Sequence, residues 1–68
     1  MGARHPLPYA FAKAHTLLLE DDGGELVLWA SDSTPASALG EVQRVHEVAR
    51  FEHEAADVLA ARIAAAYA

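Results

Sequence analysis

The chain has 68 residues, enough for one small domain, and it contains no cysteine, which excludes a disulfide framework and a thiolate zinc site. Its formal net charge is −5 and its five basic residues are scattered, whereas nucleic acids and anionic lipids are bound by clustered Lys and Arg. No apolar run approaches the roughly 20 residues of a membrane span, and a signal peptide's basic and apolar segments are missing. We therefore expect a soluble, cytoplasmic chain with no nucleic-acid partner and no direct membrane insertion.

A short helix is predicted over residues 8–14. Pro8 suits its first turn because proline has no N–H to lose. Leu7, Phe11 and Ala14 are spaced by four and three residues, so they share one helical face. About two turns are too few for a helix to be stable alone in water, so this helix is expected to pack on the segment that follows.

A β-hairpin is predicted next. Thr16–Glu20 and Glu25–Ser31 are its strands, and Asp21–Gly24 is an acidic four-residue loop whose glycines tolerate positive φ. The loop lacks the further oxygen ligands of a calcium site, so we interpret it as a solubilising tip. Leu26–Trp29 is apolar on both faces, so this strand is expected to be covered on both sides, or to present one face to a partner.

A second helix is predicted over Pro35–Glu47, with Thr34 as its N-cap. Its apolar stripe consists of Ala38, Leu39, Val42 and Val45. Glu41 and Arg44 are three residues apart and can form an ion pair on the exposed face. Gly40 inside this helix costs about 1 kcal/mol relative to alanine, a cost that close packing on the sheet would explain.

The last two elements are a short strand over Ala49–His53 and an alanine-rich helix over Glu54–Tyr67. The apolar stripe of that helix consists of Ala56, Leu59, Ile63, Ala66 and Tyr67. The order helix–strand–strand–helix–strand–helix predicts an α+β fold, with helices packed on a small three-stranded sheet. We expect residues 1–6 to be a flexible tail and residues 7–68 to be a single domain.

No pattern typical of an active site is found. A phosphate-binding loop needs G-x-x-x-x-G-K-[ST], and the single lysine, Lys13, has no glycine loop before it. The segment His46–Arg50 begins like the zinc motif H-E-x-x-H, but Arg50 stands where the second histidine would bind the metal. We therefore expect no catalytic residue, no metal, no cofactor and no enzymatic activity in this chain.

The sequence Leu7-Pro8-Tyr9-Ala10-Phe11-Ala12-Lys13, followed by an apolar strand pair, resembles the start of the N-terminal (N1) domain of type II secretion assembly ATPases, the E-protein (GspE) family. The segment Ala38–Arg44 is similar to the family's x-A-L-x-E-V-x-R pattern. The likeness extends in order and type from Pro6 to Tyr67. Gly40 departs from the family pattern, because a better helix former is expected there. Ala14-His15 also departs, because the family often continues its basic run at these positions.

This resemblance implies a docking domain that is part of a longer motor protein. In the family, this domain binds the cytoplasmic domain of the inner-membrane L-protein and so recruits the hexameric motor to the membrane platform for protein secretion. ATP and Mg²⁺ would bind in the C-terminal ATPase region, which this chain does not contain. The chain would then be cytoplasmic and peripheral to the inner membrane through its partner, with the rest of the ATPase hexamer as a further partner.

Three residues are predicted to contact a protein partner. Tryptophan and arginine are enriched among interface hot spots, which selects Trp29, Arg44 and Arg50. A core position is the alternative for Trp29, because it ends an apolar strand. The alternative function is an unrelated small α+β interaction module or an obligate homodimer that pairs edge strands, since a chain with so few large apolar residues gains stability by self-association.

Overall fold

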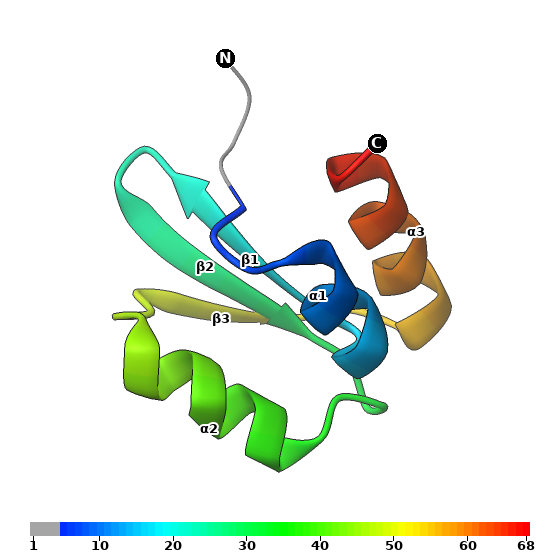
Figure 1. Ribbon diagram of the computed structural model, residues 1–68, viewed down its shortest axis with the longest axis horizontal. Coiled ribbons are helices and arrows are strands. Elements are labelled where there is room, and N and C mark those ends of the chain that lie inside the picture. Colours follow the sequence, from blue (N-terminus) through cyan, green and yellow to red (C-terminus); the bar gives the residue numbers. More distant parts are fainter. Residues whose placement is uncertain (1–4) are drawn as a thin grey trace.

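A computed structural model describes residues 5–68 of the chain, and these residues form three helices and three strands in the predicted order (Figure 1). The elements are α1 (Tyr9–His15), β1 (Leu17–Asp22), β2 (Glu25–Ala30), α2 (Ala36–Val45), β3 (Arg50–His53) and α3 (Ala56–Ala66). The predicted α+β fold is confirmed. Residues 1–4 of the predicted tail lie outside the described residues, whereas His5 already packs against the ring of Tyr67.

The three strands form one sheet in the order β1-β2-β3. β1 and β2 are antiparallel, with Leu19 opposite Leu28. β3 is parallel to β2, with Phe51 beside Leu28, and α2 makes the crossover connection that two parallel strands require. Glu54, predicted to begin the last helix, instead continues the pairing of β3, because its N–H donates to the carbonyl oxygen of Ala30 at 2.9 Å.

The hairpin loop is shorter than predicted. Asp21 and Asp22 belong to β1, and only Gly23 and Gly24 connect the strands. Both glycines have positive φ, 64° and 96°, as the tight two-residue turn of a twisted hairpin requires. The side chain of Asp21 accepts a hydrogen bond from the N–H of Gly24 at 2.9 Å, which fixes the turn. The predicted four-residue loop was therefore wrong, because two glycines alone can close the turn.

Helices cover both faces of the sheet, so the expectation for the doubly apolar strand is confirmed (Figure 1). On one face α2 packs over a core cluster made of Leu7, Leu17, Leu19, Leu28, Ala38 and Val42. On the other face α3 and α1 enclose a second cluster made of Ala12, Leu18, Leu59 and Ile63. Alternate residues of a strand point to opposite faces, which explains how Leu17, Leu18 and Leu19 can all be buried.

The side-chain placement in α1 differs from the predicted stripe. Ala12 is fully buried against α3, whereas Ala14 is exposed. The helix also ends at Thr16, which was predicted to begin the strand: Thr16 has φ 52°, and its N–H bonds to the carbonyl of Ala12. This left-handed residue turns the chain directly from α1 into β1, so the predicted strand start was wrong by one residue.

Thr34 does not cap α2, contrary to the prediction. Its hydroxyl accepts a hydrogen bond from the N–H of Ser31 at 2.9 Å and donates to the carbonyl oxygen of Thr16 at 2.5 Å. The helix begins after Pro35 with no side-chain cap. Thr34 is thus committed to joining the β2–α2 connection to the start of β1, and it has no hydroxyl hydrogen left for another acceptor.

Two further residues of α2 differ from expectation. Gly40 does not permit close packing, because a Cβ atom placed there would meet nothing within 4 Å. Val45 is 73% exposed although it lies on the predicted apolar stripe. The stripe is buried only as far as Val42, and Val45 is the last residue of the helix.

Candidate partner-binding site

Trp29 lies near the end of β2 on the face of the sheet that α3 covers, and it is only partly buried. Its indole N–H donates a hydrogen bond to the Oε1 atom of Glu20 on β1 at 2.9 Å. The guanidinium of Arg62 from α3 lies 4.1 Å from the centre of the indole ring, a cation–π distance. Trp29 therefore combines both interpretations drawn from the sequence: one part packs on the core, and the rest lies at the surface beneath an arginine.

Arg50 lies on the same face of the sheet as Trp29. It is the first residue of β3 and pairs with Val27 on β2, two positions before Trp29. Since alternate residues share a face, Arg50 and Trp29 point to the same side. The guanidinium of Arg50 is 3.6 Å from the Oδ2 atom of Asp22, and both side chains are more than half exposed. Such an exposed ion pair contributes little and is easily exchanged for another partner.

Arg44 is separated from these two residues. It lies on α2, the helix that covers the opposite face of the sheet, and forms the predicted ion pair with Glu41 on the exposed side of that helix. The structure thus brings Trp29 and Arg50 together and places Arg44 elsewhere. The ion pair is confirmed, and the role of Arg44 in partner binding stays a prediction.

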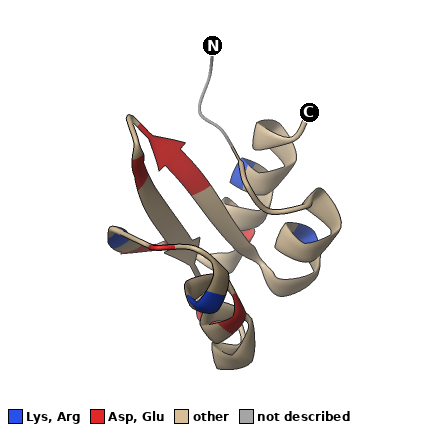
Figure 2. Cartoon of the chain, turned by 60° about the vertical axis from the view of Figure 1, so that its left-hand side comes forward, with Lys and Arg blue, Asp and Glu red and all other residues tan. Residues whose placement is uncertain are grey.

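Arg62 is the residue of this region that sequence reasoning missed. Its position beside Ile63 on a helix indicates only that it borders an apolar stripe, and the contact with Trp29 depends on how α3 crosses the sheet. We call Trp29, Arg50, Arg62 and Glu20 the Trp29 surface. Acidic residues gather near it, at the end of β1 and the start of β2, where the hairpin carries Asp21, Asp22 and Glu25 (Figure 2).

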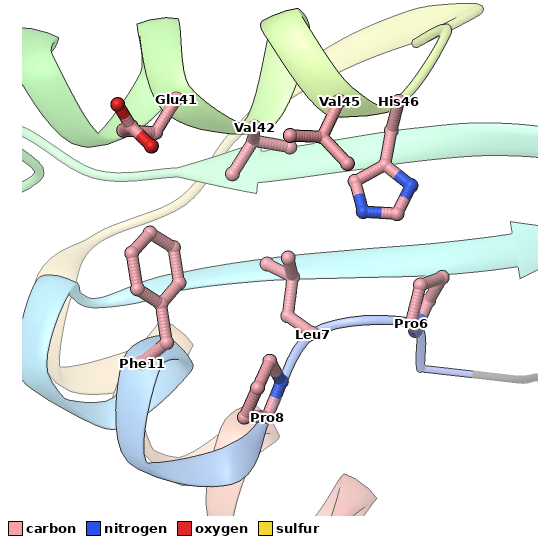
Figure 3. Close-up of a pocket in the computed structure, with 8 residues that line it drawn as sticks. All are labelled: Pro6, Leu7, Pro8, Phe11, Glu41, Val42, Val45 and His46. Carbon is pink, nitrogen blue, oxygen red and sulfur yellow. The ribbon is translucent and has the colours of Figure 1, made fainter.

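A shallow apolar groove lies on another side of the molecule, between the segment before α1 and the helix α2 (Figure 3). Leu7 and Phe11 point toward Val42 and Val45 across it, and its volume is about 220 Å³. Its polar rim consists of Glu41 and His46. One carboxylate and one imidazole at the rim of an open apolar groove do not make the converging set of polar groups that an active site uses.

Residues 5–68 contain no group of three or more His, Asp or Glu side chains that could hold a metal ion. Within the same part of the chain, no helix is both long and apolar enough to cross a membrane.

A family model of the N-terminal (N1) domain of GSPII protein E matches residues 6–67, which include every helix and strand of the structure. Neither the curated proteins nor the solved structures contain a match to the chain. The fold is that of a small α+β domain with helices on both faces of a mixed sheet. The chain belongs to this N1 domain family and is an N-terminal domain of the type II secretion E protein, the secretion ATPase.

Proposed function

We propose that this domain recruits the secretion ATPase to the inner-membrane platform by binding the cytoplasmic domain of the L-protein. The domain would then act in the cytoplasm and reach the membrane only through its partner. Membership of the N1 domain family supports this proposal, since the family resemblance implies a docking role for the domain. The proposed contact region is the Trp29 surface.

The observation that carries the proposal is the partly buried Trp29 between Glu20 and Arg62. A tryptophan fixed on one side by core packing presents a large rigid surface, so it loses little conformational entropy when a partner covers it. Arg50 and Arg62 stand on the same side and are exposed. Tryptophan and arginine are the residue types enriched among binding hot spots.

The domain itself is proposed to catalyse no reaction and to bind no cofactor. ATP and Mg²⁺ would be bound by the ATPase region of the full-length protein, and the other subunits of the hexamer would be partners of that region. In this division of labour the N1 domain supplies position, and the motor supplies the chemical energy.

Isothermal titration calorimetry of the chain with the purified cytoplasmic domain of the cognate L-protein tests the proposal. We expect a saturable 1:1 isotherm with micromolar or tighter affinity. Trp29→Ala and Arg50→Ala should each weaken binding by more than about fivefold, the effect of a hot-spot truncation above 1 kcal/mol. Arg44→Ala is the matched control, because it removes the same charge from the opposite side of the molecule.

Each outcome of this titration has a clear meaning. If wild-type chain that is folded by circular dichroism gives no heat and does not co-elute with the L-protein domain, the docking proposal is wrong. If binding occurs but only Arg44→Ala weakens it, docking stands and the contact region lies on α2 instead of the Trp29 surface.

A further inference from the structure

β3 is an unusual strand because it buries none of its side chains. All four residues, Arg50 to His53, are exposed, and Phe51 is 56% exposed. Neither core cluster of the described residues includes a residue of β3. The strand is therefore held by its backbone pairing with β2, and its other edge has no neighbouring strand in the described chain. An open strand edge is a template for another strand.

The register shows which backbone groups face that open edge. Phe51 lies beside Leu28, and the N–H of Glu54 donates to the carbonyl of Ala30. Backbone groups of successive strand residues point to alternate sides, so Glu52 and Arg50 turn toward β2 together with Glu54. Phe51 and His53 consequently present their N–H and C=O groups outward.

We propose that two copies of this chain pair through β3 in antiparallel orientation, with Phe51 on the twofold axis. Phe51 then exchanges two backbone hydrogen bonds with Phe51 of the second copy, as the hydrogen-bonded pair of an antiparallel ladder does. The two sheets of three strands become one continuous sheet of six. A twofold axis makes the contact self-complementary, which closes the assembly at two copies.

Charge complementarity supports a second copy as the occupant of this edge. With Phe51 on the axis, Arg50 of each copy lies opposite Glu52 of the other, in the non-hydrogen-bonded positions where cross-strand side chains are closest. The contact occurs twice by symmetry. The two Phe51 rings meet on the other face of the sheet, where an aromatic cross-strand pair is favourable.

Neighbouring registers are disfavoured by the same residues. An axis at His53 places Glu52 opposite Glu54, a pair of like charges. An axis at Ala49 is blocked because its N–H already donates to the carbonyl of Leu26 at 2.8 Å. The strand has only four residues, so the interface is small and belongs to the weak, transient class.

Sedimentation equilibrium of the chain over a concentration range that reaches millimolar tests this pairing. Arg50→Glu sets two carboxylates against each other at each contact, and Glu52→Arg sets two guanidinium groups against each other. Each variant alone should therefore associate roughly fivefold or more weakly than wild type. An equimolar mixture of the two variants forms a heterodimer in which one contact joins two carboxylates and the other joins two guanidinium groups, so the mixture should associate no better than either variant alone.

The double variant Arg50→Glu/Glu52→Arg provides the rescue. It exchanges the two charges within the same strand, so each contact again joins a carboxylate to a guanidinium group. We expect this variant to associate with an affinity near that of wild type. Loss of association in the double variant equal to that in the single variants would show that the contact between positions 50 and 52 does not hold the two copies together.

A cysteine pair provides the second readout. Phe51→Cys puts two thiols on the axis, so oxidation should give a covalent dimer rapidly, whereas Val58→Cys on α3, at a comparably exposed valine, should not. The proposal is overturned if the wild-type chain stays monomeric, if the double variant fails to recover association, or if both cysteine variants cross-link equally fast. These measurements use the chain alone, so they are independent of L-protein docking.

Discussion

The hydroxyl of Tyr67 donates a hydrogen bond of 2.6 Å to the backbone carbonyl of Leu7, sixty residues away in the sequence. The ring of Tyr67 also lies 5.3 Å from the rings of both Tyr9 and His5. These contacts fasten the start of α1 to the end of α3. They explain how a helix of seven residues, too short to persist alone, is ordered in this domain.

Tyr67→Phe should lower the free energy of unfolding by about 1 kcal/mol, because it removes this hydrogen bond and keeps the ring contacts. Chemical denaturation followed by circular dichroism measures the change. Tyr9→Phe is the control, since no hydrogen bond of its hydroxyl to the described residues is present and the side chain is 42% exposed. Equal losses in both variants would show that the contact with Leu7 is not stabilising.

Burial raises the pKa of Tyr67 above its ordinary value of 10.0 in the folded state. The unfolded chain therefore loses this proton at a lower pH than the folded chain. Stability is complete below pH 10 and falls as the pH rises from there through the folded pKa. Urea denaturation at about pH 8 and at pH values above 10 should show this loss in the wild type and a smaller loss in Tyr67→Phe, whereas an identical loss would exclude Tyr67 as its source.

Gly40→Ala should raise the free energy of unfolding by about 1 kcal/mol. Position 40 is helical and a Cβ atom there meets nothing, so alanine gains helix propensity without a clash. For a domain of this size the melting temperature should rise by about 4–8 °C, which a thermal scan detects. No rise in melting temperature would mean that α2 is already limited by its packing on the sheet.

Thr16→Gly should also stabilise the domain, by about 1 kcal/mol. Thr16 has a φ of 52°, and the left-handed region is unfavourable for a β-branched residue and open to glycine. The backbone carbonyl that accepts the hydrogen bond from Thr34 is retained in the variant. Thr16→Val is the informative counterpart: it keeps the β-branch and the strain, so only the glycine variant should gain stability in denaturant titrations.

Thr34→Val should cost about 1–3 kcal/mol, because it leaves the N–H of Ser31 and the carbonyl of Thr16 without their partner in a partly buried position. Ser33→Ala, at an exposed neighbour, is expected to change stability by less than about 0.5 kcal/mol. If the two variants lose equal stability, the hydroxyl of Thr34 does not hold the β2–α2 connection to β1.

The order and type of the elements were predictable because each has a local signal. The glycine pair at 23–24 marks the hairpin, and the spacing of Leu59 and Ile63 marks the buried face of α3. Element ends were less predictable. Thr34 is a good N-cap by residue type, yet its hydroxyl bonds to Thr16, and only the folded chain brings these two residues together.

The candidate site was predictable in part. Trp29 and Arg50 were selected by residue type, and their common face follows from the register of β2 and β3. That β3 is parallel to β2 is not visible in its four residues, so the sequence could not place Arg50 beside Trp29. The contact between Arg62 and the indole ring likewise depends on the packing of α3 across the sheet.

The bond between Tyr67 and Leu7 means that the two ends of the folded region lie side by side. A segment whose ends nearly touch can be inserted into a surface loop of a host protein with little stretching of the host. Residues 7–67 are therefore a graftable cassette. Placed in a host loop, they would carry the Trp29 surface to a new location and leave both flanking segments of the host at almost their original separation.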